Sequence, residues 1–442
     1  MAPRYAPSLR SRLAPLLLCL QTSFIVLFCF FTEIQKNNFT AWFFSSLPGF
    51  QDVNVMLFLG FGFFFTFPVR YGFSATAFTL LVAVVATQWG IILNGLEPHR
   101  GKIKISLKSL VEAELCTASA MISIAAVQGK TNPVQLVLIS LLEVSGFILN
   151  KWVLQSLLKV SLLNSIMLLH IFGSFFGLLL TWVFYRKGCE LQFEKEKYDQ
   201  KSGLFSMLGT LFLWMYLPTF NSVLVDDRIP GRKLKAVCST YLALAVSAVT
   251  AASMSSLCHP RGKVNMTQMQ QCILAGGVAV GVSVSGVQHP WEAMTIGFTA
   301  AVIATIGHQY LQTQMLHGFQ CHDTCATLSS FGLPGLLGWV AHLLLEIRDC
   351  DDQTTAIRFA VFHICSLLIT IALSLSTGLI TGLLLKLEVC RRPPDNKCFD
   401  DQVYWEVCHV QLYRCFVQFL ETQLKIFFYF TVSSSRGKKV RT

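Results

Sequence analysis

Leu162 to Tyr185 read LLNSIMLLHIFGSFFGLLLTWVFY, an apolar run with an ionisable side chain, His170, near its middle. About 20 predominantly apolar residues in a helix cross the ~30 Å hydrocarbon layer of a bilayer, so this run predicts a transmembrane helix. An ionisable group at that depth is costly in lipid and normally faces a protein interior or a water-filled path. His170 therefore marks the first place to look for a functional site.

The rest of the chain repeats this apolar pattern. Of its 442 residues 53% are hydrophobic and 13% are charged, which is typical of a polytopic membrane protein and not of a soluble domain. The sequence predicts an all-α membrane fold with about twelve spans. These are Leu13–Phe31, Val53–Pro68, Phe73–Leu93, Ser109–Val127, Val134–Leu154, Leu162–Tyr185, Leu204–Leu224, Ala236–Leu257, Gln271–Val287, Ala293–Leu311, Phe331–Ile347 and Ile357–Leu387.

Basic residues predict the orientation of these spans. Arg4, Arg10 and Arg12 precede the first span, and Cys29 to Phe31 offer no small-residue cleavage site, so we interpret this segment as a helix and not as a signal peptide. Most of the 35 Lys and Arg residues then fall on the side of the N-terminus, which predicts cytosolic N- and C-termini. The net charge of +11 fits orientation and attraction to anionic lipid, and a nucleic-acid partner is not expected.

Glycine and proline indicate how the spans pack. The spacings Gly173/Gly177, Gly277/Gly281 and Gly378/Gly382 favour close helix crossings. The sequence GLPG at residues 332–335 predicts a bent or broken helix near the start of the eleventh span, which is tolerated where backbone lines a cavity.

The segments outside the spans carry few signals. Most of the 15 cysteines lie in spans or face the cytosol by this topology, so a disulfide framework is not expected, and Cys189 is either palmitoylated or a plain interfacial thiol. Asn38 lies in an external N-x-T sequon and is a glycosylation candidate, with the unmodified form an equal alternative. We divide the chain into a membrane domain, 1–387, and a cytosolic tail, 388–442. Within the tail, 407–432 predicts an interfacial amphipathic helix or, alternatively, a disordered extension.

Few side chains in the spans can do chemistry. A neutral imidazole at His170 can accept and donate one hydrogen bond to a small polar solute, or it can be a buried histidine that a neighbouring helix satisfies. His342 and His363 favour packing or polar contact, and they have no companions at metal-ligand spacing, so no metal is expected. Glu143 is expected as a hydrogen-bonded or protonated carboxyl, with proton coupling as the alternative.

Phe220 stands between Pro218 and Asn221 in the seventh span, where a kink can turn its ring into a pore. Core packing is the simpler interpretation for a phenylalanine in such a helix. No phosphate-binding loop, nucleophile elbow or pair of catalytic carboxylates occurs in the sequence, so neither an enzyme nor a cofactor is predicted.

Several motifs together resemble the ammonium transporter/Rh family, and specifically its Rh branch. In chain order these are Gln51-Asp52-Val53, GFGF at 60–63, RYGFS at 70–74, GTLFLWMYLPTFNS at 209–222, LAGGVAVG at 274–281, HDTC at 322–325, GLPG at 332–335 and CFDDQVYWE at 398–406. The FDDQV portion is most similar to the Rh blood-group polypeptides of red cells, whereas the first half and HDTC are closer to the Rh glycoproteins. Residues 407–442 carry no recognised counterpart.

This resemblance implies a plasma-membrane trimer in which each subunit holds a pore between two inverted five-helix halves. In conducting members two histidines share a hydrogen bond at mid-pore, two phenylalanines gate the outer side, and an aspartate near the first histidine supports the structure. The family is thought to release a proton from ammonium and to pass neutral ammonia, because a bare ion would lose its hydration. The pattern H-x-F-G-x-x-F-G-L places the first histidine at His170. The pattern P-x-F-N places the inner of the two gating phenylalanines at Phe220.

The remaining positions depart from the family pattern. Phe331 stands where the second histidine is expected, and Leu115 stands at the outer gate. The aspartate position holds Leu162, with Asn164 as the nearest polar substitute. Phe331 and Leu162 remove hydrogen-bonding groups from the implied pore, and Leu115 removes an aromatic ring from its outer gate.

Two functions follow from the resemblance. The first is an auxiliary or structural subunit that assembles with a conducting Rh glycoprotein and reaches ankyrin and the membrane skeleton, with Phe399, Asp400 and Asp401 as the tail motif for a partner. The second is a channel for neutral ammonia or carbon dioxide that works with His170 and Phe220. An unrelated twelve-span secondary transporter is the third alternative, which the ordered motifs disfavour.

Overall fold

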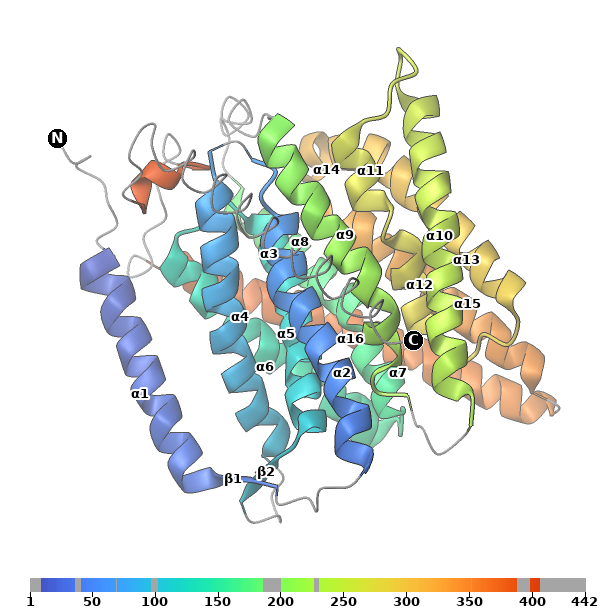
Figure 1. Ribbon diagram of the computed structural model, residues 1–442, viewed down its shortest axis with the longest axis horizontal. Coiled ribbons are helices and arrows are strands. Elements are labelled where there is room, and N and C mark those ends of the chain that lie inside the picture. Colours follow the sequence, from blue (N-terminus) through green and yellow to red (C-terminus); the bar gives the residue numbers. More distant parts are fainter. Residues whose placement is uncertain are drawn as a thin grey trace, which may run out of the picture.

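A computed structural model describes residues 9–35, 41–68, 70–96, 102–185, 200–225, 230–350, 352–387 and 398–405, without the side chains of 41–46 and 200. These residues form an all-α bundle with one short strand pair (Figure 1). The main elements are α1 (Ala14–Phe31), β1 (Thr32–Ile34), α2 (Ala41–Val55), α3 (Phe61–Phe64), α4 (Gly72–Gly95), β2 (Ile103–Ile105), α5 (Leu107–Val127), α6 (Pro133–Leu157), α7 (Leu162–Met167), α8 (Leu169–Phe184), α9 (Gln200–Ser222), α10 (Arg232–Cys258), α11 (Met266–Cys272), α12 (Ala275–Ser283), α13 (Pro290–Ile306), α14 (Gln312–Phe319), α15 (Leu333–Asp349) and α16 (Gln353–Leu385).

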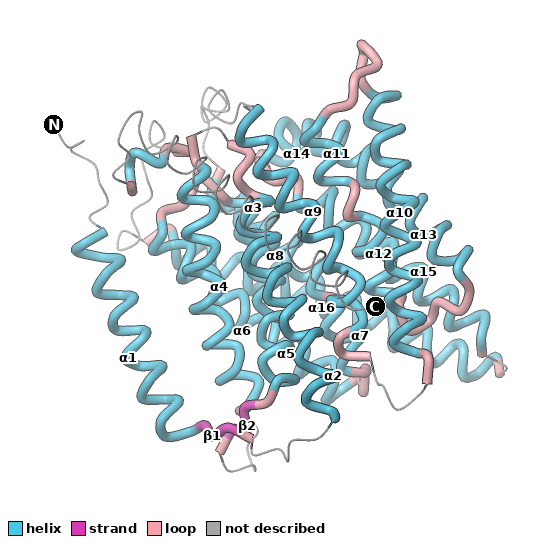
Figure 2. The backbone as a smooth tube through the Cα atoms, in the orientation of Figure 1, coloured by secondary structure: helices cyan, strands magenta, loops and turns pink. Residues whose placement is uncertain are grey.

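All twelve predicted spans coincide with helical segments, and the all-α membrane fold is confirmed. Ten of these segments are each long and apolar enough to cross a membrane. The span predicted at Gln271–Val287 divides into α11 and α12 (Figure 2). The span predicted at Ala293–Leu311 is α13 followed by a π-helical turn, Gly307–Leu311. Asn38, Cys189 and the predicted helix at 407–432 lie outside the described residues.

The bundle consists of two halves with the same internal packing. In the first half α5 packs against α4, α6 and α8, and α4 packs against α6. In the second half α12 packs against α10, α13 and α15, and α10 packs against α13. This matched packing agrees with the two inverted five-helix halves that the family resemblance implies.

Small residues hold these helices at close distance. A methyl group added to Gly173 of α8 would lie 2.6 Å from the backbone oxygen of Ser119 on α5, and one added to Gly281 would lie 2.6 Å from Asn221. A methyl group added to Gly382 of α16 would lie 2.9 Å from the Val183 side chain. All three predicted small-residue spacings therefore contribute a close helix crossing.

The break predicted at GLPG is a change in helical winding. Residues Leu328–Gly332 form a π-helical turn, and α15 begins directly after it with Pro334 in its first turn. Proline is tolerated there because the first amides of a helix have no partner within that helix. The turn carries Phe331 into the middle of the bundle.

The last helix, α16, lies across both halves. Its 33 residues span about 50 Å, which is longer than one crossing of the ~30 Å hydrocarbon layer requires. It packs against α6 and α8 of the first half and against α15 of the second. The Ser374 hydroxyl donates to the Phe172 oxygen at 2.7 Å, and the His363 ring bonds the Trp339 oxygen at 3.2 Å.

The first helix, α1, stands at the edge of the bundle beside α4 (Figure 1). The amides of Gln21 and Gln88 bond one another at 3.1 and 3.3 Å, and the Phe24 ring stacks on Trp89 with centroids 6.1 Å apart. After α1, the strand β1 pairs in parallel with β2. Leu13 and Phe24 are the buried residues of this segment, and most of its other side chains face outward.

Candidate functional site

His170 lies at a break in the sixth span. The short α7 ends at Met167, Leu168 has a turn conformation, and α8 begins at Leu169, so the histidine is the second residue of the new helix. Its side chain is 2% exposed, and neither ring nitrogen has a hydrogen-bond partner among the described residues. The first of the two sequence-based interpretations, an imidazole free to bond a solute, fits this geometry better than a histidine satisfied by a neighbouring helix.

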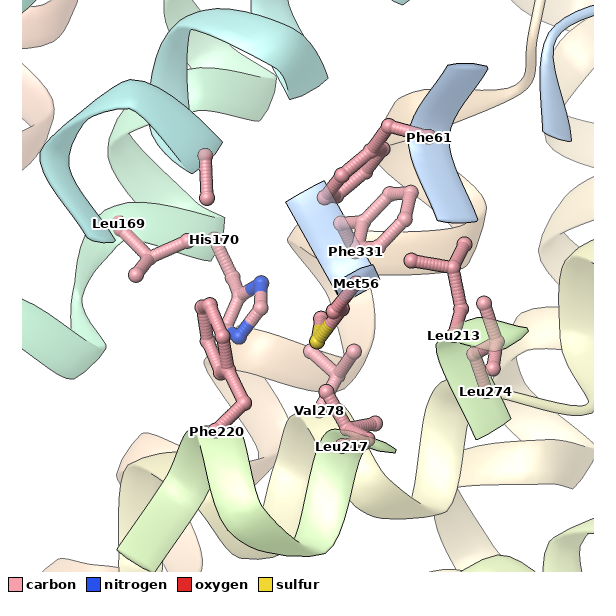
Figure 3. A pocket seen from close by; sticks show the side chains of 11 residues that line it. Met56, Phe61, Leu169, His170, Leu213, Leu217, Phe220, Leu274, Val278 and Phe331 are labelled. Carbon is pink, nitrogen blue, oxygen red and sulfur yellow. The ribbon is translucent and has the colours of Figure 1, made fainter. Parts of the chain in front are cut away.

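Two phenylalanines flank the imidazole (Figure 3). The Phe331 ring lies nearly parallel to it, with centroids 6.0 Å apart and 9° between the planes. The Phe220 ring is 6.3 Å away and tilted by 46°. The structure therefore brings together three of the residues singled out from the sequence, and at the expected second-histidine position it presents a hydrocarbon face to His170.

The three rings share one small cavity. It measures about 10 Å³, at the lower limit for a single water molecule. Apart from His170, every lining side chain is apolar. The full lining is Met56, Phe61, Ala118, Leu169, His170, Leu213, Leu217, Phe220, Leu274, Val278 and Phe331. The residues other than the three rings were not singled out from the sequence, because an apolar side chain in an apolar span carries no local signal of its position.

A cluster of aromatic rings surrounds Phe331. The centroids of Phe61 and Phe64 lie 6.3 and 6.4 Å from its own, and Phe65 packs against both at 5.7 and 5.4 Å. All four side chains are buried. Close-packed interiors leave few voids larger than water, so these rings continue the apolar closure beyond the cavity.

The other predicted pore residues lie apart from the cavity. Leu115 is fully buried on α5, about one turn before Ala118, but it is not among the lining residues. Leu162 begins α7 and packs, half-buried, against the main core. Asn164 accepts a hydrogen bond from Ser285 at 3.1 Å and belongs to a separate polar cluster.

That polar cluster centres on His342. Its Nε2 lies 2.8 Å from the Ser285 hydroxyl, 3.5 Å from the Asn164 amide and 3.7 Å from Glu346 Oε1. The ring of His363 stacks on Trp339 with centroids 4.7 Å apart. These contacts agree with the polar and packing roles expected for both histidines. Within the described ranges no three His, Cys, Asp or Glu side chains are placed to hold a metal ion.

The tail motif folds back onto its own membrane domain. The two carboxylate oxygens of Asp401 accept hydrogen bonds from the amides of Phe73 and Ser74, at 2.9 and 2.8 Å, in the first turn of α4. Phe399 is buried, and its amide donates to the Gly129 oxygen at 3.0 Å. Asp400 is half-buried, and its side chain accepts a hydrogen bond from the Gln402 amide at 3.2 Å. Two of the three motif residues, Phe399 and Asp401, thus contact the helical bundle, and a partner contact stays a prediction.

Glu292 supports the start of α13, at the edge of a span. Its Oε2 accepts hydrogen bonds from the amides of Gln288 and His289, at 2.7 and 3.0 Å, and its Oε1 pairs with Arg348 of α15. Burial opposes ionisation, but these two amides and the Arg348 guanidinium together hold the pKa of Glu292 below its ordinary value. The contact ties α13 to α15 in the second half.

Comparison with known proteins gives consistent similarities. The model of the Ammonium Transporter Family matches residues 17–397. Ammonium transporter Rh type B of Danio rerio is 37% identical, over 90% of this chain and 94% of the relative, and Rh type A of Bos taurus is 39% identical, over 82% and 84%. Among solved structures, Rh50 of Nitrosomonas europaea superposes with a TM-score of 0.73 at 26% identity, covering 88% of this chain and 99% of that one.

Proposed function

Because this chain belongs to the ammonium transporter family, in its Rh branch, we propose that it is an auxiliary or structural subunit of a mixed Rh trimer. A conducting Rh glycoprotein supplies the open pore of that trimer. The proposal rests on the stacking of the Phe331 ring on the His170 imidazole. We infer that this stack closes the centre of the subunit's own pathway.

The stack removes hydrogen bonding where a permeant would lose its water. The family resemblance implies two imidazoles in contact, each of which can bond the solute and the other ring. Here the phenyl ring of Phe331 stands at the position of the second histidine. The cavity of about 10 Å³ therefore offers a solute the two ring nitrogens of a single histidine, His170. A polar group buried without a partner costs on the order of 2–7 kcal/mol, so this pathway is poor for ammonia and worse for ammonium.

Transport by the isolated protein tests the proposal. Proteoliposomes that contain this chain alone should show methylammonium uptake and ammonia-driven pH change no faster than protein-free liposomes. A conducting Rh glycoprotein in the same lipid is the positive control. Robust flux that disappears in His170→Ala would refute an auxiliary role, because it would show that the pore works through its single histidine.

A second candidate, a channel for neutral ammonia or carbon dioxide, is favoured by the apolar lining of the cavity. A neutral gas needs no charged or hydrogen-bonding site, and small side-chain motions of Phe220 or Phe331 would admit it. Stopped-flow measurement of carbon dioxide entry separates the candidates. Carbon dioxide flux above the lipid background, reduced by a bulkier side chain at Ala118, supports the channel.

Assembly and location form the rest of the proposal. The subunit resides in the plasma membrane with both termini in the cytosol, and it contacts an Rh-associated glycoprotein and, through ankyrin, the membrane skeleton. The 35–39% identity to Rh types A, B and C over most of the chain supports assembly with Rh proteins. Copurification of the native complex, with each subunit identified by mass spectrometry, should yield mixed trimers. Exclusive self-trimers would contradict the proposal.

A further inference from the structure

Glu143 is a buried acid that the pore does not use. It lies in the middle of α6, has no exposed surface, and forms no ion pair among the described residues. The nearest basic residue along its own helix is Lys151, two turns away, which is bonded to Asn94 at 2.5 Å and lies 3.8 Å from Glu112. The helices α4 and α7, which also pack on α6, carry no titratable side chain.

The other elements packed against α6 carry further titratable side chains. Their titratable side chains are Arg10 and Arg12 before α1; Lys108, Glu112, Glu114 and Cys116 on α5; His170 on α8; and Arg358, His363 and Cys365 on α16. Among the described residues none of these side chains forms an ion pair with Glu143. An ionised carboxylate without a counter-ion costs several kcal/mol in such surroundings.

The hydrogen bonds around the carboxyl indicate where its proton lies. Glu143 Oε1 is 2.5 Å from the Ser119 hydroxyl, and that hydroxyl is 3.3 Å from the backbone oxygen of Leu169. A serine hydroxyl has one proton and cannot donate to both oxygens. If Glu143 donates its carboxyl proton to the Ser119 oxygen, the Ser119 hydroxyl is free to donate to the backbone oxygen of Leu169. Both protons then take part in a hydrogen bond. The atom left without a partner is then Oε2, as a carbonyl-type acceptor.

We propose that Glu143 is a proton-binding site, a neutral carboxylic acid whose Oε1–H donates to Ser119 and so holds the turn of α8 that carries His170. The chain of bonds joins α6, α5 and α8. Leu169, at its end, lines the central cavity and immediately precedes the histidine. Glu143 is a positioning residue: it acts through Ser119 and the α8 backbone and does not touch a permeant. The role does not depend on whether the pore conducts.

Infrared spectroscopy detects the proton directly. The full-length protein in lipid at neutral pH should show the carbonyl stretch of a protonated carboxylic acid, and Glu143→Gln should remove one such band. Glu112→Gln is the matched control, because Glu112 faces Lys151 and should contribute no such band. Absence of a band assignable to Glu143 at neutral pH would overturn the proposal.

A second measurement tests the positioning role and remains valid if one variant folds poorly. A glutamine side chain keeps an N–H donor in the place of the acid O–H. Glu143→Gln should therefore match the wild type in melting temperature and in the nitrogen-15 spectrum of the His170 ring. Glu143→Ala has no such donor and should shift both. The His170 signal is identified by its loss in His170→Gln. If glutamine disturbs the spectrum as much as alanine does, the carboxyl is ionised and the assignment is wrong.

Discussion

Replacing Asp401 with alanine should loosen the contact between the tail motif and the start of α4. The carboxylate accepts hydrogen bonds from the amides of Phe73 and Ser74 at 2.9 and 2.8 Å, where helix amides have no partner within the helix. At about 1 kcal/mol for each net hydrogen bond, the loss amounts to about 2 kcal/mol. An equilibrium changes tenfold for each 1.4 kcal/mol, so the undocked fraction of the tail should rise about 30-fold.

Hydrogen exchange measures this change. Exchange of the amides at 73, 74 and 398–405 should accelerate by up to about 30-fold in Asp401→Ala, because local opening controls their exposure. The remainder of the bundle should keep its protection. Asp400→Ala is the control, since Asp400 makes one local bond to Gln402 at 3.2 Å and should change exchange little. Equal acceleration in both variants, or none in Asp401→Ala, would refute the view that Asp401 anchors the tail.

Three further outcomes follow. Phe331→His should raise methylammonium flux in proteoliposomes above the background, whereas Phe331→Leu, which restores no hydrogen-bonding ring, should not; equal flux in both would point to steric closure alone. Glu292→Gln should lower the free energy of unfolding by about 1.5–3 kcal/mol above pH 5, because it replaces charged hydrogen bonds with weaker neutral ones. The pKa of Glu292 is lowered in the folded state, so the wild type should lose this extra stability as the pH falls through that pKa. The melting temperatures of the wild type and the variant should therefore converge in acid. Gly338→Ala places a methyl group 2.1 Å from a backbone oxygen of α12 and should cost about 1–3 kcal/mol, measured as a lower melting temperature, while Gly318→Ala, with nothing within 4 Å, should not.

The spans were predictable because membrane crossing depends on local composition. The run predicted at Leu162–Tyr185 is helical from Leu162 to Phe184. Its break at Leu168 was not predicted, since it depends on how α7 and α8 pack with other helices. The pairing of β1 with β2 was missed for the same reason: three-residue strands about 70 residues apart leave no periodic pattern to detect.

The candidate site was predictable where a motif fixes the position. The spacing around His170 and the sequence from HDTC to GLPG located two rings that the structure stacks. Met56 and Val278, which line the same cavity, are indistinguishable in sequence from lipid-facing residues. Leu115 shows the limit of transferring a position from a family pattern, because it is buried near the cavity without lining it.

The long helix α16 restricts the conformational changes by which a solute can pass through this protein. Transporters that alternate between inward- and outward-open states rock one repeat against the other. Here α16 is bonded through Ser374 to α8 in the first repeat and through His363 to α15 in the second. A single continuous helix that fastens both repeats works against such rocking. Any passage through the His170 cavity is therefore expected to open by rotation of side chains within a fixed frame.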